Sequence, residues 1–252
     1  MSGHSKWSTI KHQKGQADAR RGKLFTKLAR EITVGARKGG PDPAMNPTLR
    51  LAIDRARQSN MPMDNIERAI KRATGLGGEG AALEEVIYEG YSPGGAAIMI
   101  VALTDNRNRA ASEVRKAFDR HNSKLGEIGS VAWIFETKGV ITLEEDSQKA
   151  DEIALEAIDL GAEDFTVEAS SIDLTTTPEG FETLRQGLVD RGLNLVQAEV
   201  TLVPKTLAPL DEHAAERTLR LLDSLEELDD VQRVYTNGDF PDTVLERYGA
   251  AS

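Results

Sequence analysis

Four histidines and many carboxylates are the side chains of this 252-residue chain that could perform acid–base or metal chemistry. No two of His4, His12, His121 and His213 stand four residues apart, and none belongs to an H-E-x-x-H motif. The chain has no cysteine, which excludes disulfides, thiolate catalysis and cysteine-ligated zinc. Neither a G-x-S-x-G elbow nor a G-x-x-x-x-G-K-[ST] loop occurs. We therefore predict no catalytic residue, no metal site, no cofactor and no small-molecule substrate.

Two weaker signals keep an enzyme as a remote alternative. Gly75, Gly77 and Gly80 match a G-x-G-x-x-G pattern, but a helix is expected before them and a strand after them, the reverse of the dinucleotide motif. Acidic clusters occur at 144–146 and 226–230. Carboxylates alone can bind magnesium for phosphoryl transfer, although solvated turns and helix ends are the simpler interpretation of both clusters.

The charge of the chain is distributed very unevenly. Residues 1–75 carry 16 Lys and Arg against 6 Asp and Glu, a net charge of +10. The remaining residues carry 15 basic and 35 acidic side chains, a net charge of −20. An asymmetry of this kind indicates a segment that binds a polyanion.

The basic residues of the first expected helix share one face. The pattern predicts a helix from Asp18 to Lys38, ended by Gly39-Gly40-Pro41. At about 100° per residue, six basic side chains fall within an arc of roughly 100°: Arg20, Lys23, Lys27, Arg30, Arg37 and Lys38. We call these six residues the basic stripe. The adjoining arc is apolar and expected to face a core: Leu24, Phe25, Leu28, Ala29 and Ile32. Arg21 lies at the end of the apolar arc and is grouped with the candidate contacts.

Residues 1–16 are polar and basic without periodicity, and we interpret them as an extended arm. Its candidate contacts are Lys6, Trp7, Lys11, His12 and Lys14. Basic residues with one aromatic suit single-stranded or irregular RNA, because a base can stack on Trp7. Alternatively, Trp7 packs against the helical domain. Because nothing here resembles a base-reading code, the predicted contact is with the nucleic-acid backbone.

Element patterns predict an α+β fold with a small three-helix domain at the N-terminus. A second helix begins at Asn46-Pro47, and a third at Asp64 with Glu67 as a capping-box partner. These helices and the arm form a domain at 1–78. Residues 139–203 follow the order β-α-β-β-α-β, which predicts a ferredoxin-like domain at 137–205. It is inserted in a split α+β domain at 79–136 and 206–252, in which Ser130 to Glu136 is expected to be a buried strand.

Several segments resemble the YebC/PmpR family over essentially the whole chain. They are Gly3-His4-Ser5-Lys6-Trp7, Ile10 to Lys14, Asp18 to Lys27, Asn65 to Ile70, Tyr88 to Tyr91, Thr104 to Arg109 and Gly129 to Ala132. Ser92 and the Asn122-Ser123 pair stand where this family is expected to have glycines. The resemblance implies three domains, one inserted in another, and no enzymatic activity.

The functional implication of the resemblance is divided. Family members are named as DNA-binding transcriptional regulators, and the family includes the mitochondrial translational activator of cytochrome oxidase subunit one. Bacterial members resemble ribosome-associated factors that ease synthesis of proline-rich stretches. We favour a translation factor that contacts rRNA or tRNA over a regulator that binds promoter DNA. No apolar run approaches the roughly 20 residues of a membrane span, and no signal peptide is recognised, so we expect a cytoplasmic protein without a membrane partner.

Overall fold

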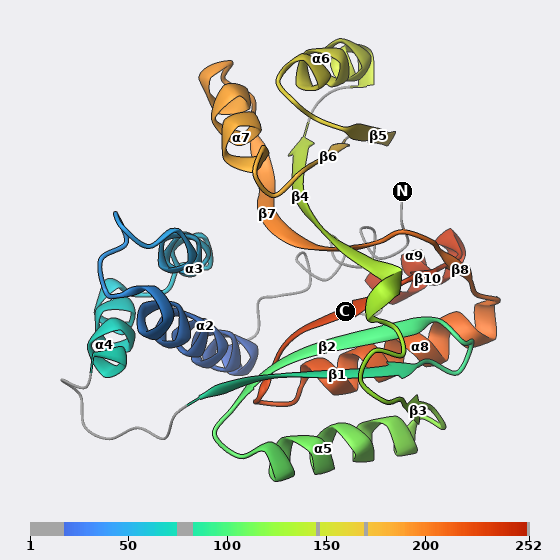
Figure 1. Ribbon diagram of the computed structural model, residues 1–252. Coiled ribbons are helices and arrows are strands. Elements are labelled where there is room, and N and C mark those ends of the chain that lie inside the picture. Colours follow the sequence, from blue (N-terminus) through green and yellow to red (C-terminus); the bar gives the residue numbers. More distant parts are fainter. Residues whose placement is uncertain (1–17, 75–82, 145–146, 169–170, 251–252) are drawn as a thin grey trace. The chain divides into compact units, whose positions relative to one another are not determined.

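The computed structural model describes residues 18–74, 83–144, 147–168 and 171–250. The fold is α+β, as predicted, with an N-terminal helical domain followed by α+β structure (Figure 1). The chain divides into two compact units. One runs from Trp133 to Thr206, and the other combines the chain up to Ala132 with the chain from Leu207 onward.

Within residues 18–74, the N-terminal domain has three helices: α2 (Asp18–Gly39), α3 (Pro47–Gln58) and α4 (Met63–Ala73). Asn46 caps α3 as predicted, because its side-chain oxygen accepts the amide of Leu49 at 3.1 Å. The Asn46 amide nitrogen also donates to the carbonyls of Gly35 and Gly40, at 2.9 and 2.8 Å, which ties the end of α2 to the start of α3. The core includes Leu28, Ile32, Leu49, Ile53 and Ile66.

Two local predictions for this domain are wrong. The capping box at Asp64 does not form, because α4 begins one residue earlier with Pro62 as its N-cap and without a side-chain cap. Leu24 does not enter the core: 41% of it is exposed, whereas Leu28 is buried. Leu24 lies near the N-terminal end of α2, before the stretch that α3 and α4 cover.

The second domain of this unit has a sheet in the order β3-β1-β2-β9 with antiparallel pairs. Its strands are β1 (Glu84–Tyr91), β2 (Ala97–Thr104), β3 (Lys124–Leu125) and β9 (Val231–Thr236). Helices α5 (Arg107–Arg120) and α8 (Glu212–Glu226) pack on one face, where Phe118 and Leu222 join Ile98 and Ile100 in a single core. The short strands β8 (Ala208–Pro209) and β10 (Gly238–Asp239) pair in parallel, and α9 (Asp242–Ala250) follows.

The buried carboxylate of Glu89 orders the segment that precedes the other unit. It accepts the backbone amides of Gly129, Val131 and Ala132 at 2.7, 2.6 and 2.9 Å. Since these amides are taken, residues 130–134 do not pair as a strand, and the prediction is wrong for them; only Phe135 and Glu136 of the predicted run belong to a strand. Ala132–Ile134 forms a short 3-10 helix (η1) instead, in which Trp133 is 67% exposed.

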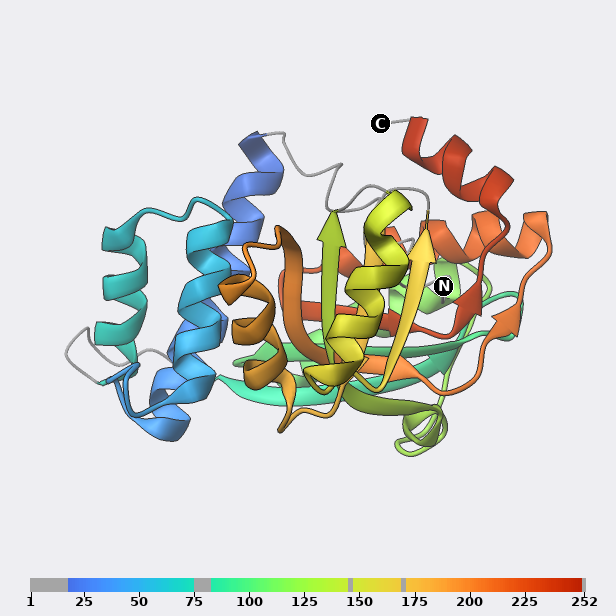
Figure 2. The same ribbon diagram turned by 90° about the horizontal axis from the view of Figure 1, so that it is seen from above.

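The unit from Trp133 to Thr206 has the predicted ferredoxin-like order. Its elements are β4 (Phe135–Glu144), α6 (Ser147–Asp159), β5 (Asp164–Glu168), β6 (Ser171–Thr176), α7 (Phe181–Asp190) and β7 (Leu195–Pro204). The strands pair antiparallel in the order β5-β6-β4-β7. Figure 2 shows α6 and α7 side by side over this sheet.

Asp230, in the turn between α8 and β9, joins the helical domain to the α+β domain of the same unit. One carboxylate oxygen accepts from Arg30 of α2 at 2.9 Å, and the other accepts from Arg109 at 2.7 Å and Thr104 at 2.8 Å. Burial alone would raise the pKa of Asp230, but hydrogen bonds from Arg109 and Thr104, with the charges of Arg109 and Arg30, lower it below its ordinary value of 3.8.

We predict that Leu28→Ala lowers the free energy of unfolding by about 2–5 kcal/mol, because it leaves a cavity in the helical core. Leu24→Ala should cost less than about 1 kcal/mol, since its side chain is already largely in water. Urea denaturation of both variants measures the difference. Equal losses would contradict the placement of these two leucines.

Asp230→Asn should lower the free energy of unfolding by about 1–3 kcal/mol at neutral pH, because Arg30 and Arg109 lose their shared charged acceptor. The pKa of Asp230 is depressed in the folded state, so its contribution is complete above pH 3.8 and is lost as the pH falls through the folded-state value. The difference between wild type and variant should therefore shrink below that pH in denaturation series. Asp119→Asn, on the exposed surface of α5, is the matched control and should change little at any pH.

Candidate nucleic-acid interface

The candidate contacts of the arm, Lys6, Trp7, Lys11, His12 and Lys14, lie outside the described residues. Arg20 and Arg21 are in the first turn of α2, but their side chains are also outside the described part. The structure therefore places the other five members of the predicted set: Lys23, Lys27, Arg30, Arg37 and Lys38.

Three members of the basic stripe bind the C-terminal end of α8. Lys23 donates to the carbonyl of Glu227 at 3.4 Å, and Lys27 donates to the carbonyl of Glu226 at 2.6 Å. Arg30 donates to the carbonyl of Asp229 as well as to the carboxylate of Asp230. The last carbonyls of a helix lack partners within the helix and carry partial negative charge, so cations stabilise them. Spacing of four and three residues along α2 brings the three side chains to one place.

The interpretation of the acidic cluster at 226–230 as a solvated helix end fits Glu227 and Asp229, whose side chains are exposed, but it is wrong for Asp230. Asp230 is buried, and the backbone oxygens of Glu226, Glu227 and Asp229 accept from α2. The partners of this cluster on α2 lie about 200 positions earlier in the chain. A scan for local motifs could not reveal them.

The last turn of α2 presents the rest of the stripe to solvent. Arg37 and Lys38 are exposed, and Lys38 lies 3.8 Å from Glu85, which is also exposed. The guanidinium of Arg37 makes no hydrogen bond or ion pair with any described residue. A weak exposed pair and an unpaired cation leave both side chains available to phosphates.

Further cations lie on α3 and α4, which the sequence reasoning did not consider. Arg50, Arg57, Arg68, Lys71 and Arg72 are all exposed. Most have local partners, such as the pairs of Arg57 with Asp54 at 3.8 Å and Lys71 with Glu67 at 3.9 Å. The signal that could have found them is the same charge count that identified the N-terminal segment, applied to each helix separately.

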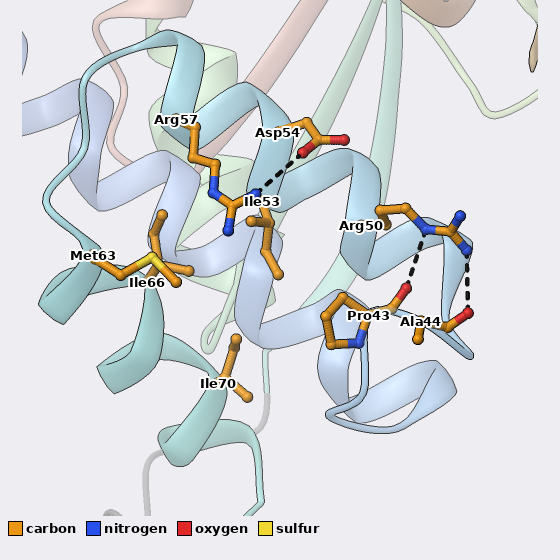
Figure 3. Close-up of a pocket in the computed structure, with 9 residues that line it drawn as sticks. All are labelled: Pro43, Ala44, Arg50, Ile53, Asp54, Arg57, Met63, Ile66 and Ile70. Atoms are coloured by element: carbon orange, nitrogen blue, oxygen red, sulfur yellow. Dashed lines mark hydrogen bonds and ion pairs between the residues drawn. The ribbon is translucent and has the colours of Figure 1, made fainter. Parts of the chain in front are cut away.

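A shallow pocket of about 420 Å³ lies between α3 and α4 (Figure 3). Ile53, Ile66 and Ile70 form its apolar part, with the half-exposed Met63 at its edge. Arg50 donates to the carbonyls of Pro43 and Ala44, at 3.1 and 3.3 Å, so its guanidinium is held at the opposite end. Asp54 is the one carboxylate of this lining, and the pocket offers no acid–base pair or nucleophile for catalysis.

The described part of the chain shows neither a candidate metal site nor a helix that could span a membrane. Within it, no group of three or more His, Asp or Glu side chains is arranged to hold a metal ion. None of the helices described there is long and apolar enough to span a bilayer.

Comparison with known proteins places the chain in a family. Residues 5–76 match the family model "TACO1/YebC protein N-terminal domain", and residues 83–238 match "TACO1/YebC second and third domain". A "probable transcriptional regulatory protein" of Dictyoglomus turgidum is 51% identical over 247 residues, covering 98% of this chain and 99% of that protein. A protein of the same description from Dehalococcoides mccartyi is 51% identical over 248 residues, 98% of each chain.

A solved crystal structure is also similar to this chain in fold and in sequence. The crystal structure of a conserved hypothetical protein from Aquifex aeolicus superposes with a TM-score of 0.80 at 46% identity, over 90% of this chain and 93% of that one. The resemblance predicted from the sequence is thereby confirmed: the chain belongs to the TACO1/YebC family.

Proposed function

We propose that this protein is a non-catalytic, cytoplasmic regulator of gene expression that binds nucleic acid through residues 1–78. The observation that carries the proposal is the charge division, +10 in residues 1–75 against −20 in the remainder. Cations concentrated in one segment attract phosphates, and the release of counterions supplies sequence-independent affinity. The proposed contacts are the exposed Arg37 and Lys38 together with the five candidate residues of the arm.

We favour structured RNA on the ribosome, rRNA or tRNA, as the target, with the protein acting as a translation factor that eases proline-rich stretches. A recognition helix reads bases in the major groove with its N-terminal residues. The corresponding part of α4 presents the exposed carboxylates of Asp64 and Glu67, which phosphates beside the groove would repel. The basic N-terminal segment is thus better suited to the nucleic-acid backbone than to base reading.

A DNA-binding transcriptional regulator is the second candidate, and two observations favour it. The relatives from Dictyoglomus and Dehalococcoides carry the name of probable transcriptional regulators. In addition, α3 and α4 are joined by only four residues, Ser59 to Pro62, with Asn60 in the left-handed region at φ 57°. A turn of this length occurs in helix-turn-helix proteins.

Crosslinking in cells, followed by sequencing of the bound nucleic acid, distinguishes the two candidates. We expect rRNA and tRNA to be recovered, together with co-sedimentation with ribosomes at moderate salt. Recovery of a defined promoter, with a preference of at least about 1000-fold over random duplex, would instead establish the transcriptional regulator. Recovery of neither would refute the proposed function.

A second experiment tests the arm in the full-length protein. Replacing Lys6, Lys11 and Lys14 by Ala should flatten the slope of log K against log[salt] by about 2 to 3 units, because each phosphate contact contributes roughly 0.9. The control replaces Lys138, Arg185 and Lys205, which removes the same charge from the unit at 133–206. An unchanged slope in the arm variant would show that these lysines do not contact phosphates.

A further inference from the structure

A basic surface lies along α8, within the part of the chain whose net charge is negative. The exposed side of this helix is divided lengthwise into an acidic edge and a basic edge. Glu212, Glu216 and Asp223 form the acidic edge, and α9 neutralises it: Arg247 lies 2.7 Å from Glu212 and 3.2 Å from Glu216, and Tyr248 donates to Asp223. The acidic edge is therefore satisfied within the molecule.

Among the residues that the structure describes, no ion pair neutralises the basic edge in this way. Arg217, Arg220 and Ser224 stand at i, i+3 and i+7, so they lie along one side of α8. Ser224 is 2.8 Å from the ring nitrogen of His121, the residue that ends α5, which brings the neighbouring Arg120 to the same place. Figure 1 shows α5 and α8 covering the same sheet. We call Arg120, Arg217 and Arg220 the α5–α8 patch.

The three guanidinium groups of the patch are unpaired. None of them makes a hydrogen bond or ion pair with any residue in the described ranges, and the same holds for the side-chain carboxylates of Glu113 and Asp119, the nearby acids of α5. Arg120 and Arg220 are exposed, and Arg217 is half-buried. Burial lowers the pKa of His121, and the charges of Arg120, Arg220 and Arg217 lower it further, as expected for four basic groups gathered together.

Like charges held together without a counterion are costly, and an external anion would relieve that repulsion. The guanidinium fork matches the geometry of phosphate oxygens and is held here on two packed helices. A polyanion bound to the N-terminal segment would be repelled by an uninterrupted surface of net charge −20. A local reversal of sign would allow it to continue onto this domain.

The patch is also close to the basic stripe. Along α8, Arg220 is about 9 Å from Glu226, whose carbonyl binds Lys27 of α2. Lys23 is exposed at the same helix end and donates to Glu227. Cations of the two domains therefore line up along one helix.

We propose that Arg120, Arg217 and Arg220 form a second contact surface for the phosphate backbone of the bound nucleic acid. The inference rests on the proposed function, since it concerns the same ligand. It differs from the charge count, which assigns all nucleic-acid contact to residues 1–78.

The test uses full-length R217Q/R220Q and the matched control R185Q/R191Q, which removes two arginines that pair with Glu182 and Glu156 instead. Binding of purified ribosomal RNA and of random-sequence duplex DNA is measured across a salt series. R217Q/R220Q should bind about tenfold more weakly at 0.1 M salt, with a slope flatter by about 1 to 2 units, while the control stays close to wild type. Its melting temperature should be unchanged, and NMR titration should show the pKa of His121 rising towards 6.5.

The possible results distinguish failure of the second contact surface from failure of the proposed function. If wild type binds neither nucleic acid, the proposed function fails. If wild type binds and R217Q/R220Q matches the control in affinity and slope, the second contact surface is refuted while the proposed function stands. Loss of binding to polyglutamate without loss of nucleic-acid binding would assign the patch to an acidic protein and overturn the inference. Should R217Q/R220Q melt early, R120Q alone, on the exposed end of α5, repeats the test.

Discussion

One buried carboxylate, that of Asp230, holds the basic helix against the acidic part of the chain. It is shared by Arg30 of α2 and Arg109 of α5, and Thr104 donates a further hydrogen bond. A buried carboxylate is costly unless it is paired and hydrogen-bonded. Hydrogen bonds from Arg109 and Thr104 contribute most to keeping Asp230 ionised, and the charge of Arg30 on α2 adds to them. The contact of α2 with the end of α8 also gives Lys27 a helix carbonyl to bind. Where the basic stripe can meet solvent follows from this one interaction.

Because α2 contacts the end of α8, part of its positive charge is neutralised within the protein. A single-signed helix face is usually explained by an external polyanion, but α2 meets part of its requirement internally, at the negative end of the α8 dipole. Cations that remain exposed, such as Arg37, are then the ones that can contact phosphates without losing an internal partner. On α8 itself the acidic edge is neutralised by α9, whereas the basic edge is left open. Net charge alone would have concealed this local difference.

Much of the fold could be predicted from the sequence because its signals are local. Asn46-Pro47 begins α3 as expected, and alternating strand and helix patterns identify the ferredoxin-like order. What could not be predicted depends on distant partners. The run from Ser130 has strand-like residues, but its middle, Ala132–Ile134, becomes a 3-10 helix next to the point where Glu89, some 40 positions earlier, binds the backbone amides. Likewise, the stripe was identifiable by helical spacing, but its binding to the end of α8 was not. That the side chains of the arm contact nucleic acid remains a prediction.

Lysine acetylation footprinting by mass spectrometry, with and without ribosomal RNA, tests the central claim most directly. Lys27 should react slowly in the free protein, because its ammonium binds the carbonyl of Glu226, and RNA should leave its reactivity unchanged. Lys6, Lys11 and Lys14 should react readily in the free protein and become protected when RNA binds. Fast reaction of Lys27 in the free protein, with protection only in the complex, would contradict the account, because the stripe would then be open to nucleic acid and not held by α8.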